Sequence, residues 1–259
     1  MALKILLNIL THGDELVGVR VKDEILKKYP KLIGDSVDVQ IANERAYQEG
    51  KRYIDQDLNR VFPGKADGTY EEKRAFELVR VVSAYDVVID IHSTKSGLED
   101  TVIVTKLDPA TKELLQKLSP RNVLFMNMKP DRALISCARI GIAFEMGKDT
   151  HSKTVIKTTE GVEFIFSYYG LISPVKPFGF QTEYYEVFES VAKPAGAHLE
   201  PHVQNFKQIK TGEIFARTSD KIEIRAVYDF YPVIFGSTNY ESIFGFAARK
   251  MPGGLDSKK

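Results

Sequence analysis

The chain has 259 residues, of which 43% are hydrophobic and 27% are charged, so it can bury a core and is not intrinsically disordered. Its formal net charge of +1 supplies no chain-wide attraction for nucleic acid or an anionic membrane. The single cysteine, Cys137, cannot form an intramolecular disulfide, which indicates a reducing compartment. The first apolar run, residues 5–10, is too short to span a bilayer. We therefore expect a cytoplasmic protein without a nucleic acid or membrane partner.

Strand and helix patterns alternate up to about residue 170. Short, β-branched and almost continuously apolar runs, typical of strands buried on both faces, occupy residues 5–10, 37–42, 87–91, 101–106, 123–127 and 140–144. Helical spacing of apolar residues follows the acidic pair Glu71 and Glu72, and again follows Pro109. This alternation predicts the α/β class, with a mixed open sheet flanked by helices.

The pattern changes after residue 172. Residues 173–177 contain two prolines and are typical of a linker, and the apolar runs beyond them are short and separated by Pro and Gly. These runs cover residues 184–191, 209–216, 221–228 and 231–235. We expect an α/β domain at 1–172, a smaller β-rich C-terminal domain at 173–250 and a frayed tail at 251–259.

Three side chains at strand ends could bind a metal. His12 and Glu15 follow the first strand at a spacing of three, and His92 ends the strand at 87–91. In an open α/β sheet ligands bind beyond the carboxyl ends of the strands, and two imidazoles with one carboxylate form a catalytic zinc pattern. Asp90, two residues before His92, could orient a ligand. A surface His-x-x-Glu and a hydrogen-bonded core histidine are the structural alternatives.

Two further segments carry polar groups suited to hydrolysis. Glu145 follows the run at 140–144 and could exchange a proton with water and with a leaving amine. Arg52 and Arg60 frame a segment with neither helical nor strand periodicity, and guanidinium groups bind carboxylates and developing oxyanions. Taken alone, Glu145 is most simply a solvated residue at a strand end, and the segment from Arg52 to Arg60 an ion-paired loop.

Four motifs in this order resemble one family. His12-x-x-Glu15, the nine residues from Arg52 to Arg60, Asp90-Ile-His92-Ser and Glu145-x-Gly are similar to the motifs of the aspartoacylase and succinylglutamate desuccinylase family. Its members are zinc-dependent amidohydrolases related to the zinc carboxypeptidases. Residues 206–214, 231–235 and 239–241 are also similar to the family's β-rich C-terminal domain, which caps the active site.

The resemblance implies a role for each motif residue. His12, Glu15 and His92 would hold one Zn²⁺ per chain. Glu145 would act as general base and then as general acid, and Arg52 would polarise the scissile carbonyl and stabilise its oxyanion. The implied reaction is hydrolysis of the amide bond of a small N-acyl amino acid.

The same resemblance implies how a substrate would be held. Asn59 and Arg60 would bind its α-carboxylate, Asp57 would brace their loop, and Tyr240 would help to close the pocket. Where aspartoacylases have an arginine for the side-chain carboxylate of N-acetylaspartate, this chain has Ile135. Preference for N-acetylaspartate is therefore not implied.

Two other functions use the same residues. A zinc carboxypeptidase would apply this chemistry to peptides, and a non-catalytic module would bind only a metal or a carboxylate ligand. The acyl group, the amino acid, the physiological metal and the existence of a homo-oligomer stay open at this stage.

Overall fold

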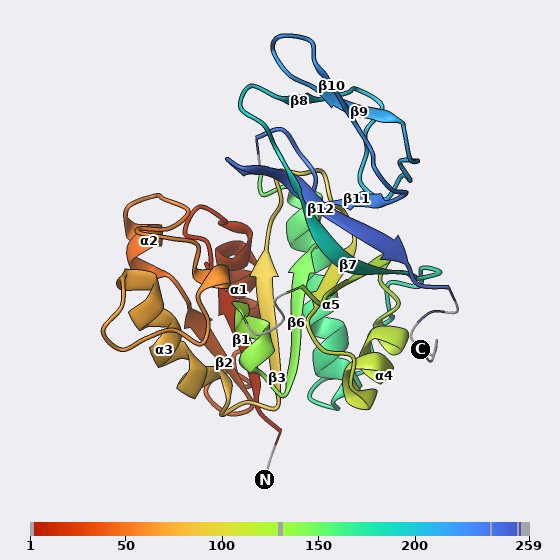
Figure 1. Ribbon diagram of the computed structural model, residues 1–259. Coiled ribbons are helices and arrows are strands. Elements are labelled where there is room, and N and C mark those ends of the chain that lie inside the picture. Colours follow the sequence, from red (N-terminus) through yellow and green to blue (C-terminus); the bar gives the residue numbers. More distant parts are fainter. Residues whose placement is uncertain (1–2, 129–131, 239, 253, 255–259) are drawn as a thin grey trace.

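The computed structural model of the protein describes residues 3–128, 132–238, 240–252 and 254 (Figure 1). Within these residues, nine strands form a large sheet and three form a small one. The strands of the large sheet lie in the order β11 (Tyr231–Val233), β12 (Ile243–Lys250), β7 (Glu183–Ala192), β5 (Asn122–Met126), β4 (Thr101–Val104), β6 (Ile140–Glu145), β3 (Val87–His92), β1 (Ile5–Ile9), β2 (Val37–Ile41). The small sheet has the order β10 (Glu223–Arg225), β9 (Ile214–Arg217), β8 (His198–Leu199). The predicted α/β class with a mixed sheet is confirmed.

The strands that carry the motifs are neighbours and run in parallel. β1 pairs with β2 and β3, and β3 pairs with β6, all in parallel. β4 is antiparallel to β6, and β12 is antiparallel to both β7 and β11. Because β1, β3 and β6 point the same way, their carboxyl ends meet at one edge of the sheet.

Helices cover both faces of this sheet. They are α1 (Val17–Lys28), α2 (Glu44–Gln48), α3 (Tyr70–Val82), α4 (Pro109–Leu118) and α5 (Ser152–Tyr168), with 3-10 turns η1 (Leu58–Arg60) and η3 (Leu134–Cys137). Ile5, Leu7 and Ile9 share one buried cluster with α1, α4 and α5, whereas Leu6 lies in a second cluster with α3 and η3. Successive strand residues face opposite sides of a sheet, so burial on both faces explains the continuous apolar runs. No helix of the described residues has the length and apolarity needed to cross a membrane.

The C-terminal part contributes to both sheets. β7, β11 and β12 extend the large sheet, because β5 pairs with β7 across residue 172. The small sheet projects beyond β11 and β12, at the top of Figure 1, around an aromatic cluster that includes Phe215, Phe230 and Phe244. The division into domains at residue 172 stays a prediction. Of the tail expected to be frayed, residues 253 and 255–259 lie outside the described residues.

β12 is the main element that the sequence patterns did not predict. Its centre holds Gly245, Ala247 and Ala248, residue types that are depleted in strands. Gly245 has a φ of +151°, and a Cβ there would lie 2.5 Å from the carbonyl oxygen of Ile234. Gly245 thus allows the backbone of Ile234 and Phe235 to approach the strand closely.

Candidate active site

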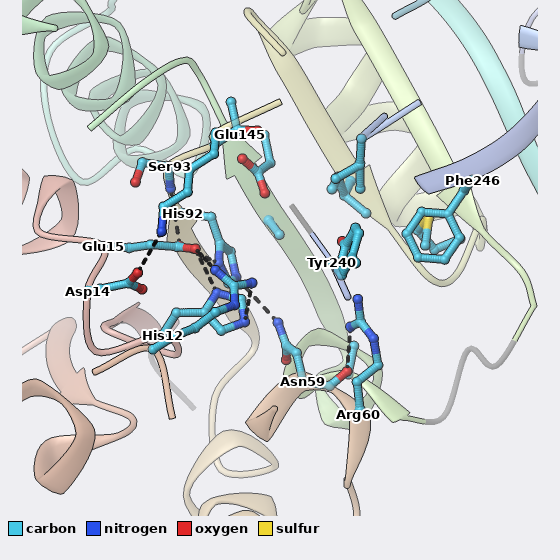
Figure 2. Close-up of a pocket in the computed structure, with 18 of the residues that line it drawn as sticks. His12, Asp14, Glu15, Asn59, Arg60, His92, Ser93, Glu145, Tyr240 and Phe246 are labelled. Carbon is cyan, nitrogen blue, oxygen red and sulfur yellow. Dashed lines mark hydrogen bonds and ion pairs between the residues drawn. The ribbon is translucent and has the colours of Figure 1, made fainter. Parts of the chain in front are cut away.

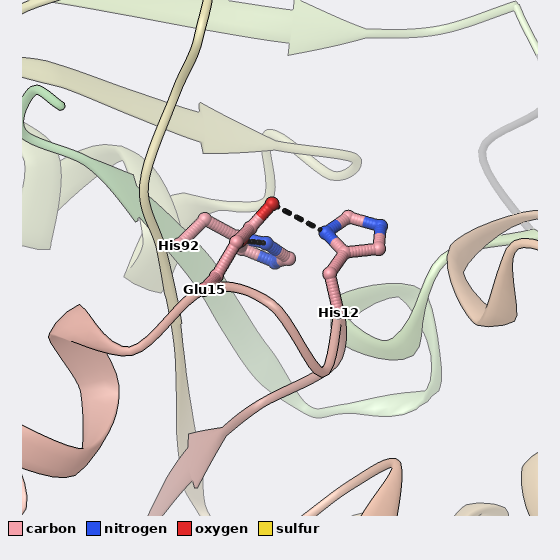
Figure 3. A group of neighbouring side chains, drawn as sticks. All are labelled: His12, Glu15 and His92. Carbon is pink, nitrogen blue, oxygen red and sulfur yellow. Dashed lines mark hydrogen bonds and ion pairs between the residues drawn. The ribbon is translucent and has the colours of Figure 1, made fainter. Parts of the chain in front are cut away.

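Two imidazoles and one carboxylate meet at the carboxyl ends of β1 and β3 (Figure 3). His12 and Glu15 lie in the turn after β1, and His92 is the last residue of β3. Glu15 Oε1 is 2.8 Å from His12 Nδ1, and Glu15 Oε2 is 2.9 Å from His92 Nδ1. All three residues are buried, and each offers a ligand atom within 4.8 Å of the other two. The structure thus brings the predicted ligands together, and this donor set suits Zn²⁺.

The turn that carries His12 and Glu15 depends on a close backbone approach. Leu10 has a φ of +58° where the chain leaves β1. The Gly13 N–H donates to the carbonyl of Arg52 at 3.0 Å, and a Cβ on Gly13 would lie 2.3 Å from the backbone of Ala46 and Tyr47. Only glycine fits there without a shift, so the turn is held against the segment that begins at Arg52.

A second layer of carboxylates orients the imidazoles. His92 Nε2 lies 2.8 Å from Asp90 Oδ2, and His12 Nε2 lies 3.1 Å from Asp57 Oδ1. Asp90 Oδ1 also accepts hydrogen bonds from Asn8 and Thr11, each at 2.7 Å. Carboxylates in this position fix the tautomer and ring orientation of ligating histidines. The Nε2 atoms thus have carboxylate partners, and both Nδ1 atoms face Glu15, where they could share a metal with its carboxylate.

The charges in this cluster shift its pKa values. Burial opposes a charged imidazole, but Glu15 and Asp57 outweigh it and raise the pKa of His12 above its ordinary 6.5. For His92, Asp90 and Glu15 outweigh burial in the same way and raise the pKa well above 6.5. Burial would raise the pKa of Glu15, yet the two imidazoles lower it well below its ordinary value. The carboxylates and imidazoles of the cluster thus stabilise one another's charged forms.

Zinc should therefore compete with protons for this cluster. A histidine binds a metal only in its neutral form, so we expect the zinc affinity of the metal-free protein to fall as the pH drops through the raised pKa values of His12 and His92. The loss should be about tenfold per pH unit for each proton displaced. Competition with a chelating dye across a pH series measures it. An affinity that does not change with pH would contradict the expectation.

Glu145 lies beside the three candidate ligands. It is the last residue of β6 and is paired in register with His92. Its Oε2 atom is buried and has no hydrogen-bond partner within the described part of the chain. Burial raises the pKa of this carboxyl to about 7. A group that can gain and lose a proton near neutral pH is suited to general acid–base catalysis.

The segment from Arg52 to Arg60 reaches the same place without regular structure before η1. Arg52 Nη1 donates to Glu15 Oε1 at 2.9 Å, and Asn59 Nδ2 lies 3.4 Å from His92 Nε2. Arg60 Nη1 donates to the carbonyl of Asn59 at 2.8 Å. The Asp57 carboxylate accepts from the backbone N–H of Asn59 at 2.9 Å, so Asp57 braces this loop while it also pairs with His12.

Most of these side chains line a cavity of about 610 Å³, shown in Figure 2. Arg52, Asn59, Arg60, Glu145 and Tyr240 all line it together with the three candidate ligands. Asp57 is not among its described lining residues. Burial raises the pKa of Tyr240, and its ring packs edge-on against Phe246 at 6.0 Å. The cavity is also lined by three further cationic side chains and two acidic ones, namely Lys95, Arg132, Lys148, Asp14 and Asp149.

The other wall of the cavity is apolar and was not predicted from the sequence. It consists of side chains from β4, β5, β6, β12 and nearby loops, namely Ile103, Met126, Met128, Ala133, Ile135, Ala143, Ile234, Ile243 and Phe246. In the sequence these residues are indistinguishable from core residues of strands. Only Ile135 was singled out in the sequence, because it stands where aspartoacylases have an arginine, and it does line the cavity.

The chain is similar in sequence to known proteins. The family model described as "Succinylglutamate desuccinylase/Aspartoacylase catalytic domain" matches residues 3–167. Aspartoacylase of Rattus norvegicus is 32% identical over 168 residues, which cover 59% of this chain and 51% of that protein. The chain thus spans about half the length of that relative. An N-acyl-aromatic-L-amino acid amidohydrolase (carboxylate-forming) of Xenopus laevis is 26% identical over 282 residues, covering 92% of this chain and 91% of the relative.

A solved structure extends the similarity of fold to almost the whole chain. The crystal structure of murine aminoacylase 3 superposes with a TM-score of 0.80 at 21% sequence identity and covers 96% of this chain and 95% of that one. Both the large mixed sheet and the C-terminal strands therefore have counterparts in a known fold.

Proposed function

Because the chain belongs to the succinylglutamate desuccinylase/aspartoacylase family, we propose that it is a zinc-dependent hydrolase that cleaves the amide bond of a small N-acyl amino acid. One observation carries the proposal: the buried His12–Glu15–His92 set lies beside Glu145, whose buried oxygen has no partner among the described residues. All four side chains line one cavity.

The positions of the side chains support the role that we propose for each. When held by the three ligands, zinc would polarise a carbonyl oxygen and make water more acidic. Glu145 would take the proton of the attacking water and then deliver it to the departing nitrogen. Arg52, which points its guanidinium at Glu15, would donate to the negative charge that develops on the carbonyl oxygen.

The cations of the cavity support an anionic substrate. Arg60 lines the cavity near Tyr240, and Asn59 lines it between Arg60 and the histidines (Figure 2). Together they would bind the α-carboxylate of an N-acyl amino acid. Tyr240 would close this end over the bound substrate. A carboxylate held there would leave the amide carbonyl directed toward the metal ligands.

The C-terminal part of the chain supports a small substrate over a peptide. Ser190, Thr238, Tyr240, Ile243 and Phe246, all beyond residue 172, line the cavity. Tyr240 and Phe246 lie on the side away from His12 and Glu15 (Figure 2), where their rings would hinder a longer peptide chain.

A deacylation screen tests the function. The purified protein is assayed with acetyl, succinyl and longer-chain N-acyl amino acids and with oligopeptides, before and after chelation and zinc restoration, and its metal content is determined. The proposal expects chelator-sensitive release of free amino acids. Preferential cleavage of oligopeptides would favour a carboxypeptidase, and a metal-free protein that binds these compounds without cleaving them would favour a binding module.

The apolar wall further leads us to propose an apolar group on the substrate. The Xenopus laevis relative is named for N-acyl-aromatic amino acids, and Ile135 contributes to the apolar wall of the cavity here. Burial of a Leu or Phe side chain is worth about 1.5–3 kcal/mol. We therefore expect kcat/KM for N-acetyl-phenylalanine or N-acetyl-leucine to exceed that for N-acetyl-alanine by about 10- to 100-fold. Faster turnover of N-acetylaspartate than of all three would overturn this specificity and leave the hydrolase proposal standing.

A further inference from the structure

Glu71 is a fully buried carboxylate that lies outside the cavity. It lies in the first turn of α3 and has 0% exposure. In the sequence it is one of two acidic residues that begin a helix, an arrangement usually explained by the helix dipole. Unlike Glu72, Glu71 is fully buried. An ionised carboxylate in the interior needs hydrogen bonds or cations to compensate for the loss of water.

Neutral amide groups provide this compensation. Glu71 Oε1 accepts hydrogen bonds from the backbone N–H of Ile54 at 2.6 Å and from Asn43 Nδ2 at 3.2 Å. Oε2 accepts from the N–H of Asp55 at 2.9 Å and of Gln56 at 3.3 Å. No Lys, Arg or His forms an ion pair with Glu71 in the described ranges. Three consecutive N–H groups of an irregular segment thus converge on one carboxylate.

The neighbouring side chains strengthen the same junction. Asp55 Oδ2 accepts from the backbone N–H of Tyr70 at 2.8 Å, and Gln56 Nε2 donates to Thr69 Oγ1 at 2.6 Å. Residues 54–56 are therefore fastened to the first turn of α3 through both backbone and side chains.

The fastened segment lies between two residues of the active site. Arg52, two positions before Ile54, pairs with Glu15 at 2.9 Å, and Asp57, directly after Gln56, pairs with His12 at 3.1 Å. Since the segment has no ladder of its own, its N–H groups need other acceptors. Without them the backbone would lose the conformation that directs Arg52 and Asp57 toward the His12–Glu15 turn.

We propose that Glu71 is a positioning residue, which acts on the reaction by holding the Ile54–Gln56 backbone and, through it, Arg52 and Asp57. The kinetic part of this inference rests on the proposed function; the structural part does not. In Glu71→Gln the side chain keeps its size, but an NH₂ group replaces one acceptor and faces N–H donors.

The test compares Glu71→Gln with Glu72→Gln in the zinc-loaded protein. Glu72 belongs to the capping box of the same helix and pairs with Lys65, so it controls for a weakened α3. For Glu71→Gln we expect faster hydrogen exchange at residues 54–56, unchanged exchange in β1 and β3, and full zinc content. Loss of such supporting contacts typically lowers activity about 10- to 100-fold. We expect this loss in kcat, because Arg52 would act in the transition state. Glu72→Gln should change neither exchange at residues 54–56 nor kcat.

Glu71→Asp keeps the charge on a shorter side chain, so its kcat and its hydrogen exchange at residues 54–56 should lie between those of Glu71→Gln and the wild type. If Glu71→Gln does not fold, Glu71→Asp provides the test. The inference is overturned if residues 54–56 keep their protection in both Glu71 variants, or if exchange rises equally throughout the sheet. Loss of protection with unchanged kcat overturns it as well. If the wild type cleaves no N-acyl amino acid, the proposed function fails, whereas the exchange data still decide whether Glu71 holds the segment.

Discussion

Glu145→Gln is expected to lower kcat by about 10²–10⁴-fold, the usual cost of removing a general acid–base group. The amide keeps the size of the side chain but cannot take the proton from water. Because Oε2 has no partner among the described residues, the substitution breaks no hydrogen bond there. The variant should therefore unfold at the wild-type temperature and contain as much zinc. Steady-state kinetics, metal analysis and thermal unfolding measure these three quantities.

The pH profile of the wild type provides a second measure of Glu145. The base must be deprotonated, so kcat/KM should fall as the pH drops through its pKa. Burial raises that pKa to about 7 in the metal-free protein, and a nearby dication lowers it. The acidic limb of the profile should therefore lie at or below about pH 7.

Glu163→Gln is the matched control for Glu145→Gln, because Glu163 is a buried carboxylate that pairs with Lys28 and does not line the cavity. Near-native kcat in Glu145→Gln would remove Glu145 from the mechanism.

His12→Ala should abolish activity by removing one of the three proposed metal ligands. Loss of a residue that merely supports a ligand weakens metal binding by about 10- to 100-fold, so loss of the ligand itself should exceed the upper end of that range. Glu15 keeps its contacts with His92 and Arg52, and for this reason we expect the variant to fold. Zinc content after dialysis and the zinc dissociation constant are the measurements.

His202→Ala controls for the loss of an imidazole. His202 lies in the C-terminal part and pairs with Glu213 at 3.2 Å, away from the cavity. This variant should keep wild-type zinc content and turnover. If His12→Ala retained stoichiometric zinc with unchanged activity, the assignment of the ligand set would be wrong.

Much of the site could be predicted because its parts are local in sequence. His12 and Glu15 lie three residues apart in one turn, and Asp90 and His92 lie two apart on one strand, where alternate side chains share a face. Glu145 could be added because residues at the carboxyl ends of neighbouring parallel strands meet at one edge. For Arg52, Asn59 and Arg60 the chemistry was clear, but only the family resemblance gave them roles, since their segment has no periodicity.

The amino-acid sequence by itself determined the α/β class, the strands of the large sheet up to β6 and the candidate metal ligands. Apolar periodicity and short residue spacings record those features directly. Only the tertiary structure decided that β12 extends the large sheet, that Asp57 contacts His12, that Glu71 holds residues 54–56, and that an apolar wall faces the ligands. Each of these depends on where side chains from distant segments point after packing, and a buried residue has the same sequence pattern whether it faces the core or lines a cavity.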